Sequence, residues 1–230
     1  MYVYGKNSCE EILKKEKNIK FVFLDHNFND KTIISLIEKL NLRVIFHTKR
    51  ELDQLASGNH QGIILDVGDF VYANLDDLIK ENGFILMLDH LEDTHNFGAI
   101  IRTAEAAGVD GIIIPKDRSV SVNSTVMKTS SGAAVDMKIC LVTNLVQTIK
   151  YLKDKGYWIV ASDMQGVPYT SIDYQENIVL IIGNEEKGVS ELVKKSADYV
   201  VSIPMKGKIN SLNASVAAGI LIYEVIKNRS

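Results

Sequence analysis

The sequence predicts an α/β protein with a mostly parallel sheet, preceded by a smaller α/β unit. From Gly83 onward, short apolar runs alternate with helical patterns, which is typical of β–α–β units. The segment Ile178–Ile182 is apolar at every position, as expected of a strand that is buried on both faces. These features favour the α/β class.

The hydrophobic periodicity gives each element an expected range. In the C-terminal part, strands are expected at Phe84–Leu88, Gly111–Ile114, Met137–Leu141, Trp158–Ala161, Ile178–Ile182 and Tyr199–Ile203. Helices are expected there at Gly98–Ala107, Asn123–Thr129, Leu145–Lys155, Ser190–Ser196 and Leu212–Ile226. In the N-terminal part, helices are expected at Glu10–Lys17, Asn29–Leu40 and Lys49–Ala56, and strands at Lys20–Leu24, Leu42–Phe46 and Gly62–Val67.

The change of pattern divides the chain into two domains. Residues 1–67 form the small unit, in which basic and acidic residues balance. Residues 68–82 are acidic and irregular, apart from a possible helical turn at Asp76–Lys80, and are interpreted as a linker. Residues 83–230 then form the larger domain.

The composition limits the classes of function that the protein can have. The chain is 46% hydrophobic and 24% charged, with a net charge of −3 and a pI near 6.0, which is ordinary for a soluble globular protein. The chain as a whole is not basic, so any RNA binding must use local basic patches or shape recognition. No signal peptide and no apolar run of about 18 residues is found, and the two cysteines form no CxxC pair. We therefore expect a cytoplasmic protein without a membrane anchor.

Common catalytic and nucleotide-binding motifs are absent. The chain has no G-x-G-x-x-G, Walker A, H-E-x-x-H or G-x-S-x-G sequence. Its five histidines show no metal-ligand spacing, so no metal site is expected. A cofactor would have to bind at the loops that follow the later strands.

The first segment of interest places Asn96 and Arg102 six residues apart. Asn96 is expected to cap a helix that begins near Gly98, and Arg102 would lie about a turn and a half inside it. Two interpretations stay open. The pair is an ordinary cap with a surface arginine, or Arg102 meets a phosphate or a reacting hydroxyl near the helix N-terminus, which favours anions.

The second segment, Gly183–Gly188, follows the buried strand Ile178–Ile182. Its two glycines permit tight turns and close approach of the backbone to a ligand. Glu185 is expected to point toward the carboxyl edge of the sheet, where open α/β sheets bind ligands. The alternative is a solvated turn that caps the next helix.

In the third segment, Pro204 ends a strand. Ser211 and Asn213 flank Leu212 at the start of a helix, where both residue types cap well. The helix then carries the small residues Ala214, Ser215, Ala217, Ala218 and Gly219. Small residues allow close packing against a loop or a second subunit. The alternative, a capped core helix, leaves the excess of small residues unexplained.

Taken together, the three segments resemble the signature motifs of the SpoU (TrmH-type) RNA 2′-O-ribose methyltransferases. The run from Asn96 to Arg102 resembles the first motif, Gly183-Asn184-Glu185 the second, and Ser211-Leu212-Asn213 the third. Tyr4-Gly5 and His60-Gln61-Gly62-Ile63 further resemble the RlmB-type branch. That branch methylates a guanosine ribose in 23S ribosomal RNA, and its small N-terminal domain resembles ribosomal protein L30e and binds RNA.

The resemblance implies a SPOUT-type α/β-knot, a trefoil-knotted fold and one of the rare exceptions to unknotted topology. The knot would hold S-adenosylmethionine in a bent shape and release S-adenosylhomocysteine. Gly183, Ile203 and Leu212 would contact the adenine and ribose. The full implied cofactor set is Thr129, Gly183, Asn184, Gly188, Ile203, Met205 and Leu212. The resemblance also implies a homodimer through the catalytic domain, including its C-terminal helix.

The catalytic set implied by the resemblance is Asn96, Arg102, Glu185, Ser211 and Asn213. The family picture makes Arg102 the base or its partner. Because a guanidinium stays protonated, we prefer that Arg102 grips the target phosphate and stabilises the developing alkoxide, while the others orient it and the ribose. RNA would be bound as a looped-out, single-stranded nucleotide.

Two departures from the family pattern stand out. Glu186 occupies a position where many relatives have glycine, and a positive φ there would disfavour glutamate. Thr94 replaces a common proline.

Three alternatives to a 23S ribosomal RNA methyltransferase remain. The first is 2′-O-methylation of tRNA or of another ribosomal RNA site, including the antibiotic-resistance type. The second is a non-catalytic RNA-binding or ribosome-assembly protein, which the intact catalytic set disfavours. The third is an α/β enzyme that uses another nucleotide, which the missing glycine-rich loop disfavours.

Overall fold

The structure is a computed structural model that describes residues 1–16, 19–56, 58–208 and 211–229. The chain forms two compact units. The first comprises Met1–Val71 with Val122–Val135, and the second Tyr72–Ser121 with Asp136–Ser230. Residues 122–135 thus pack with the N-terminal unit, although their place in the sequence put them in the C-terminal domain. Contacts of the Lys128 ammonium with the ring of Tyr4, 5.1 Å from its centroid, help to hold them there.

The first unit is built on a four-stranded sheet of order β1-β4-β2-β3. β4 runs antiparallel to both β1 and β2, whereas β2 and β3 are parallel. The elements of this unit are β1 (Tyr2–Tyr4), α1 (Lys6–Lys14), β2 (Phe21–Asp25), α2 (Lys31–Lys39), β3 (Val44–His47), α3 (Lys49–Leu55), β4 (Ile63–Asp66), α5 (Ser124–Thr129) and the 3₁₀ turn η2 (Ala133–Val135).

The second unit has a six-stranded sheet of order β10-β8-β9-β5-β6-β7, in which all pairs are parallel. This confirms the predicted α/β class. Its elements are η1 (Leu75–Leu78), β5 (Phe84–Asp89), α4 (Thr94–Ala106), β6 (Gly111–Pro115), β7 (Ile139–Val142), α6 (Leu145–Asp154), β8 (Trp158–Pro168), η3 (Tyr169–Ser171), β9 (Ile178–Gly183), α7 (Glu191–Ser196), β10 (Tyr199–Ser202) and α8 (Ala214–Arg229).

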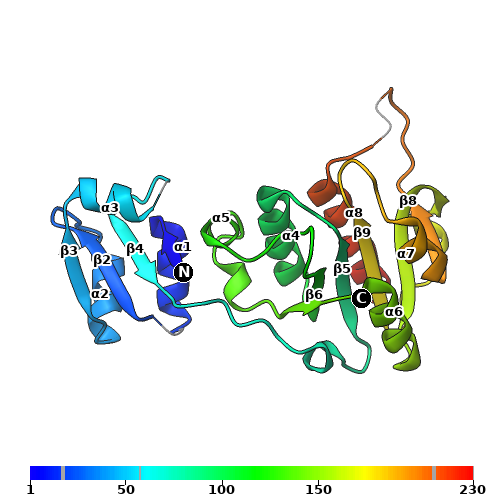
Figure 1. Cartoon of the computed structure of the whole chain (residues 1–230), viewed down its shortest axis with the longest axis horizontal. Helices are drawn as coiled ribbons and strands as arrows, with labels where there is room; N and C mark the ends of the chain where they lie inside the picture. Colours follow the sequence, from blue (N-terminus) through cyan, green and yellow to red (C-terminus); the bar gives the residue numbers. More distant parts are fainter. Residues whose placement is uncertain (17–18, 57, 209–210, 230) are drawn as a thin grey trace. The chain divides into compact units, whose positions relative to one another are not determined.

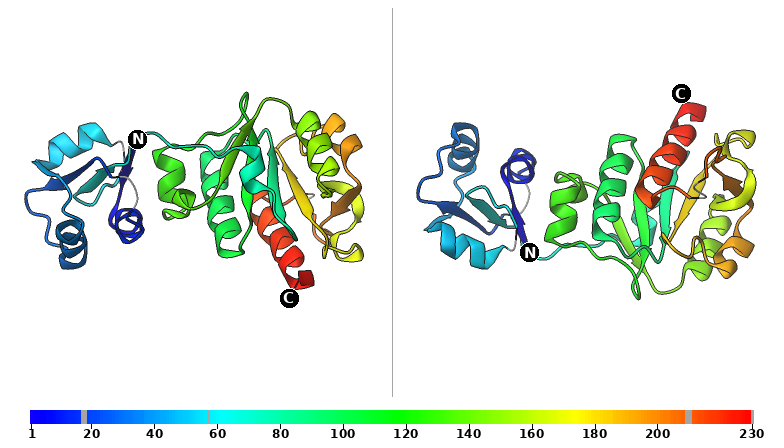
Figure 2. Two further views of the ribbon diagram at one scale, coloured as in Figure 1. Left: turned by 90° about the horizontal axis from the view of Figure 1, so that it is seen from below. Right: turned by 90° about the horizontal axis from the view of Figure 1, so that it is seen from above.

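Helices cover both faces of this sheet (Figures 1 and 2). α8 packs on β9 and against α4, while α6 and α7 pack together on the other side. Every residue of β5 and β9 is buried, which explains their unbroken apolar sequence. Alternate residues of the two strands, such as Ile85, Met87 and Ile181, join α6 and α7 in one hydrophobic cluster.

The expected elements are found with shifted ends. α4 begins at Thr94 rather than near Gly98. β8 continues past Ala161 to Pro168, with a register shift against β10 that leaves residues 162–166 outside the pairing. The segment interpreted as a linker holds η1 and a bridge from Ala73 to Cys140. Lys17, the expected end of the first helix, lies outside the described residues.

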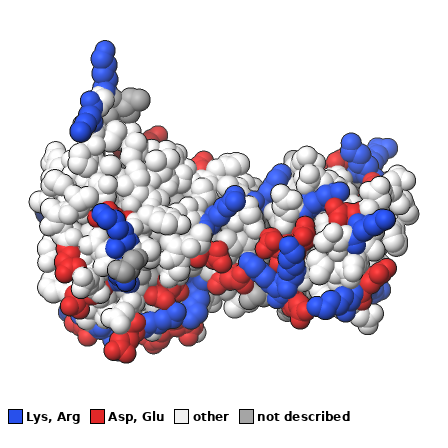
Figure 3. All heavy atoms as spheres, turned by 180° about the vertical axis from the view of Figure 1, so that it is seen from behind, with Lys and Arg blue, Asp and Glu red and all other residues white. Residues whose placement is uncertain are grey.

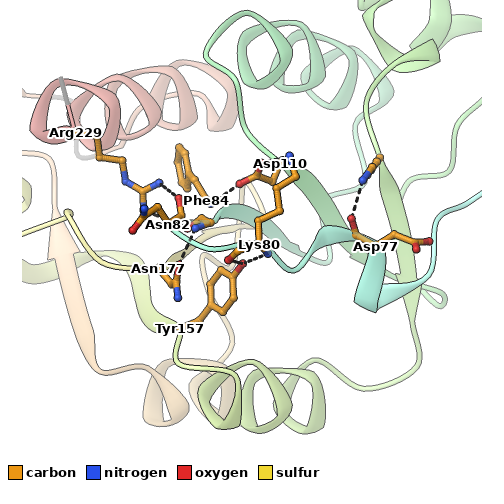
Figure 4. Close-up of polar contacts among 10 residues, drawn as sticks. Asp77, Lys80, Asn82, Phe84, Asp110, Tyr157, Asn177 and Arg229 are labelled. Atoms are coloured by element: carbon orange, nitrogen blue, oxygen red, sulfur yellow. Dashed lines mark hydrogen bonds and ion pairs between the residues drawn. The ribbon is translucent and has the colours of Figure 1, made fainter.

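Arg229 ties the end of α8 to the base of the sheet. Its guanidinium donates to the carbonyl oxygens of Tyr174 (3.0 Å), Asn82 (2.9 Å) and Gly83 (3.2 Å), and also to that of Glu176. It lies 5.4 Å from the ring centroid of Phe84 (Figure 4). One side chain therefore satisfies backbone carbonyls at the starts of β5 and β9.

Neighbouring contacts complete this corner of the unit. The Tyr157 hydroxyl accepts from the Lys80 N–H at 3.1 Å, and the Asn177 side-chain oxygen accepts from the Gly83 N–H at 2.7 Å (Figure 4). Burial raises the pKa of the Tyr157 phenol, so it stays a neutral hydrogen-bonding group at physiological pH. Within the described ranges, no helix has both the length and the apolar character needed to cross a bilayer.

Replacing Arg229 by alanine is expected to destabilise the second unit by about 2–3 kcal/mol, because the carbonyls lose a charged donor. Urea unfolding followed by the fluorescence of Trp158, the single tryptophan and a residue of β8, measures this. Lys227→Ala on the same helix removes a cation that is 73% exposed and serves as the matched control. Equal midpoints for the two variants would contradict the assignment.

Candidate active site

Three loops of the second unit meet through one asparagine. The Asn96 side chain, on α4, donates from Nδ2 to Oε1 of Glu185 at 2.9 Å. Its Oδ1 accepts from Nδ2 of Asn213 at 2.9 Å. Glu185 follows β9 and Asn213 precedes α8, so the predicted convergence of the three segments at the carboxyl edge of the sheet is observed.

The role predicted for Asn96 as a helix cap is wrong. Asp93 caps α4 instead, and its carboxylate accepts from the Asn96 N–H at 2.6 Å. The helix therefore begins four residues earlier than expected, and Asn96 lies in its first turn. This frees the Asn96 amide to bind the other two loops.

The direction of this hydrogen-bond chain is fixed by the start of α8. Oδ1 of Asn213 accepts from the N–H and hydroxyl of Ser215 (2.9 and 2.6 Å) and from the N–H of Val216 (3.4 Å). The Asn213 NH₂ must then face Asn96, whose own NH₂ must face Glu185. An amide can accept on one side and donate on the other, which a carboxylate cannot.

The loop after β9 folds tightly onto itself. Asn184 and Gly188 exchange two backbone hydrogen bonds of 3.1 and 2.9 Å. A Cβ on Gly183 would lie 2.1 Å from the carbonyl carbon of Gly188, so only glycine fits there. Among the described residues of this loop, the positive φ belongs to Gly188 (65°) and not to Glu186. The glutamate at this position therefore imposes no backbone strain.

The Asn184 side chain holds this loop in place. Its Oδ1 accepts from the N–H groups of Glu186 (2.9 Å) and Lys187 (3.3 Å), and its NH₂ donates to the carbonyl of His90 (2.9 Å). Both ends of the amide are thus used within the protein. Any contact of Asn184 with a ligand would be made by its backbone.

A buried carboxylate, Asp89, supports the same loops and was not predicted. It is 1% exposed at the end of β5. One oxygen lies 2.6 Å from Nδ1 of His90, and the other accepts from the Ser190 N–H at 2.7 Å. An aspartate directly after the apolar run Phe84–Leu88 was the available sequence signal, because a buried charge requires partners.

A pocket of about 310 Å³ opens beside Glu185. Eight predicted site residues line it: Gly183, Asn184, Glu185, Gly188, Ile203, Met205, Ser211 and Leu212. The remaining lining residues are Ser162, Asp163, Met164, Ile182, Glu186, Lys187, Val201, Ala214, Ala217 and Leu221. Its mixed apolar and polar walls, at the carboxyl ends of β9 and β10 and the middle of β8, suit a small organic cofactor.

The sequence did not reveal that β8 contributes to this pocket. Ser162, Asp163 and Met164 belong to the five residues that leave the pairing with β10. A Cβ on Gly166 would lie 2.5 Å from the backbone of Val201, so glycine allows the strand to rejoin β10. The expected end of this strand at Ala161 marks the start of the irregularity.

Asp163 is ionised in this wall. Burial raises the pKa of its carboxyl, but the Lys194 ammonium at 2.8 Å and the Gln165 N–H at 2.9 Å lower it by more, so the net pKa lies below the usual value. The pocket therefore carries an anionic side chain from β8, whereas Glu185 comes from the loop after β9.

Two predicted site residues neither line this pocket nor join the hydrogen-bond chain of Asn96. Thr129 lies in α5, within the first unit, where its hydroxyl donates to the carbonyl of Thr125 at 2.8 Å. Arg102 is exposed and makes no hydrogen bond or ion pair with any part of the chain that the structure describes. Six residues correspond to 600° around a helix, so Arg102 and Asn96 occupy different faces of α4. Ile209 and Asn210 of the third segment lie outside the described residues.

Family comparison agrees with this geometry. A model described as the SpoU rRNA Methylase family matches residues 83–223, and one described as RNA 2′-O ribose methyltransferase substrate binding matches residues 2–73. The chain belongs to the SpoU family of RNA methyltransferases, and the resemblance noted from the motifs is confirmed.

Individual relatives cover nearly the whole chain. It is 40% identical to a Bacillus subtilis protein named as a TrmH family tRNA/rRNA methyltransferase, YacO, over 100% of this chain and 96% of the relative. It is 37% identical to a similarly named protein of Staphylococcus saprophyticus, over 99% and 96%.

Solved structures share the fold. The Streptomyces viridochromogenes SpoU methyltransferase AviRb, in complex with AdoMet, gives a TM-score of 0.89 at 22% identity, over 100% of this chain and 90% of that one. An AdoMet-bound rRNA methyltransferase of Sinorhizobium meliloti gives 0.83 at 25% identity, over 98% and 86%.

Gly183→Ala is expected to lower the melting temperature of the protein by about 5 °C or more, because the new Cβ meets backbone that cannot move aside. Gly207→Ala is the control, since nothing lies within 4 Å of a Cβ there. Thermal unfolding of both variants checks this. A Gly183 variant as stable as the control would show that the loop has another conformation.

Proposed function

We propose that this protein transfers a methyl group from S-adenosylmethionine to the 2′-hydroxyl of a guanosine ribose in 23S ribosomal RNA. The main structural support is the hydrogen-bond chain from Asn213 through Asn96 to Glu185. It joins side chains from all three motifs, and one of these, Glu185, lines the pocket. Membership of the SpoU family supports the reaction class.

The pocket is the proposed cofactor site. Gly183, Gly188 and Leu212 bring backbone close to it, and Ile203 and Met205 give it apolar surface. When bound, S-adenosylmethionine supplies an electrophilic methyl group on a sulfonium. The AdoMet-bound Sinorhizobium meliloti relative supports this assignment. Thr129 is omitted from the proposed site, because it does not line the pocket.

Glu185 and Asn213 are proposed to orient the ribose. Both are exposed, so a nucleotide can reach them. Oε1 of Glu185 is held by Asn96, which leaves Oε2 without a hydrogen-bond partner among the described residues. Ser211 adds a hydroxyl to the pocket wall. In the proposed complex these groups would accept from or donate to the ribose, as positioning of a nucleophile requires.

Arg102 is proposed to bind the target phosphate and to stabilise the developing alkoxide. Its guanidinium is exposed and unpaired within the described chain, so it is available to an anion. Arg102 lies on another face of α4 than Asn96. We therefore propose that in a dimer the Arg102 of one copy reaches the site around Asn96 and Glu185 of the other. α8 offers a dimer surface, with Val216 50% and Tyr223 53% exposed. The trefoil knot is proposed as part of the same domain.

Ribosomal RNA is the proposed substrate because the N-terminal unit matches the family's substrate-binding model and carries the RlmB-like segments. The relatives are named for tRNA as well as rRNA, so both RNAs belong in the test. A cytoplasmic location, where either RNA is found, is part of the proposal.

Incubation with tritiated S-adenosylmethionine and unmethylated total RNA is expected to label a guanosine of 23S RNA. Arg102→Ala should lower the rate by at least about 100-fold, and Arg102→Lys should not restore it, because an ammonium lacks the bidentate fork. Mapping of 2′-O-methyl groups gives the position. Label in tRNA would refute the substrate, and no label with no S-adenosylhomocysteine binding would refute the enzyme.

Asn96→Asp is expected to lower kcat by at least about 100-fold, because a carboxylate there faces Glu185 and cannot donate to it. Asn144→Asp is the matched control. Its side chain caps α6 only by accepting the Gln147 N–H, which aspartate also does. Single-turnover methylation compares them, and similar rates for both variants would contradict the hydrogen-bond chain.

A further inference from the structure

One wall of the proposed cofactor pocket is built from a part of β8 that no neighbouring strand pairs with. Residues 162–166, here called the β8 bulge, leave the pairing with β10, and β9 pairs only with the part of β8 that precedes them. Three of these five residues, Ser162, Asp163 and Met164, nevertheless line the pocket. Irregular strand segments of this kind are common next to active sites. Because the sheet ladder does not fix the β8 bulge, its position depends on side-chain contacts.

Side chains from two other elements of the described chain hold the β8 bulge. At its end, the Ser202 hydroxyl of β10 donates to the carbonyl oxygen of Gly166 at 2.8 Å. In its middle, the Lys194 ammonium of α7 donates to Oδ2 of Asp163 at 2.8 Å. The other oxygen of Asp163 accepts from the Gln165 N–H at 2.9 Å, a bond within the bulge itself. Lys194 therefore ties the middle of the bulge, which lines the pocket, to the rest of the unit.

The helix that carries Lys194 is itself firmly anchored. Val189, just before α7, and Val193 within it belong to the hydrophobic cluster that also holds residues of β5 and β9. The Lys194 ammonium further pairs with Glu191, on the same helix, at 2.7 Å. The Lys194 side chain is 23% exposed and that of Asp163 is 17% exposed. Water therefore screens this ion pair less than a pair on the open surface, where such contacts contribute little.

A second ion pair of the same unit has the same construction but does not line the pocket. Lys153 on α6 donates to one oxygen of Asp198 at 2.7 Å, and the other oxygen accepts from the Ile159 N–H at 2.9 Å. The two side chains are 35% and 23% exposed. Charged side chains of both signs are also interspersed on the face that Figure 3 shows. An ion pair as such is thus ordinary in this protein, and the Asp163–Lys194 pair differs by the wall that it holds.

We infer that Lys194 is a positioning residue of the cofactor site, which acts through Asp163 to hold the β8 bulge in the arrangement that a bound cofactor contacts. Without the ion pair, the bulge would occupy this arrangement only part of the time, and the apparent dissociation constant rises as that fraction falls. The inference rests on the proposed function, because the ligand is S-adenosylmethionine or its product. It adds α7, which none of the three motifs includes, to the elements that determine cofactor affinity.

The test measures binding of S-adenosylhomocysteine to the full chain by isothermal titration calorimetry. Asp163→Asn keeps an oxygen for the Gln165 N–H but removes the charge, and it should weaken binding about tenfold. Asp198→Asn makes the same change in the second ion pair and should bind as the wild type does. Thermal unfolding of the two variants without ligand should show similar losses of stability, so a difference in affinity reports on the bulge and not on general destabilisation.

Substitutions of the cation test the same pair from its other side. Lys194→Met should weaken binding as Asp163→Asn does, whereas Lys194→Arg keeps a cation for the carboxylate and should weaken it less. Wild-type affinity in Asp163→Asn and Lys194→Met, or an equal loss in Asp198→Asn, would overturn the inference, and binding by the wild type would leave the proposed function standing. A wild-type protein that does not bind S-adenosylhomocysteine would overturn both.

Discussion

The catalytic unit depends on one side-chain amide that accepts on one side and donates on the other. Asn96 joins a loop 89 residues away and another 117 residues away. Its orientation is not free, because the backbone N–H groups of α8 orient Asn213, which orients Asn96 in turn. The position of Glu185 is therefore linked to the start of a helix with which it shares no direct hydrogen bond.

Close backbone contact is the second constraint on the site. Gly183 and Gly166 each stand where a side chain would collide with the chain passing beside it. At these two positions, backbone segments pass close to each other beside the pocket. This explains how a chain without a glycine-rich first loop can still build a cofactor-sized pocket. The glycines that allow this, Gly166 and Gly183, lie in β8 and at the end of β9, and not after the first strand of the sheet.

The sequence predicted the parts of the structure that local patterns determine. Continuous apolar runs gave β5 and β9 within a residue, because burial on both faces leaves no other pattern. Glu185, expected at the carboxyl edge from its turn after a buried strand, and Leu212, assigned by resemblance, both line one pocket, while their roles stay predictions. Asn96 was misassigned because Asp93 is an equally good cap three residues earlier. Local preference could not distinguish them.

Other features depend on contacts between distant residues and left no local signal. The packing of residues 122–135 with the first unit depends on contacts with β1, more than a hundred residues earlier. The departure of residues 162–166 from the ladder follows from the partner strand β10, which comes later in the chain. Thr129 was assigned to the cofactor by resemblance, and its helix α5 packs with the first unit.

The hydrogen bonds of Arg229 can form only after the residues that accept them have been synthesised. Its guanidinium meets carbonyls of residues made 146 and 147 positions earlier, so the base of the sheet stays open until translation has nearly passed α8. A chain that is cut short or trimmed within its last helical turn would keep every motif residue yet lack this lock. Such a product would lose the charged donor of the carbonyls at the starts of β5 and β9, which favours local opening of the backbone there.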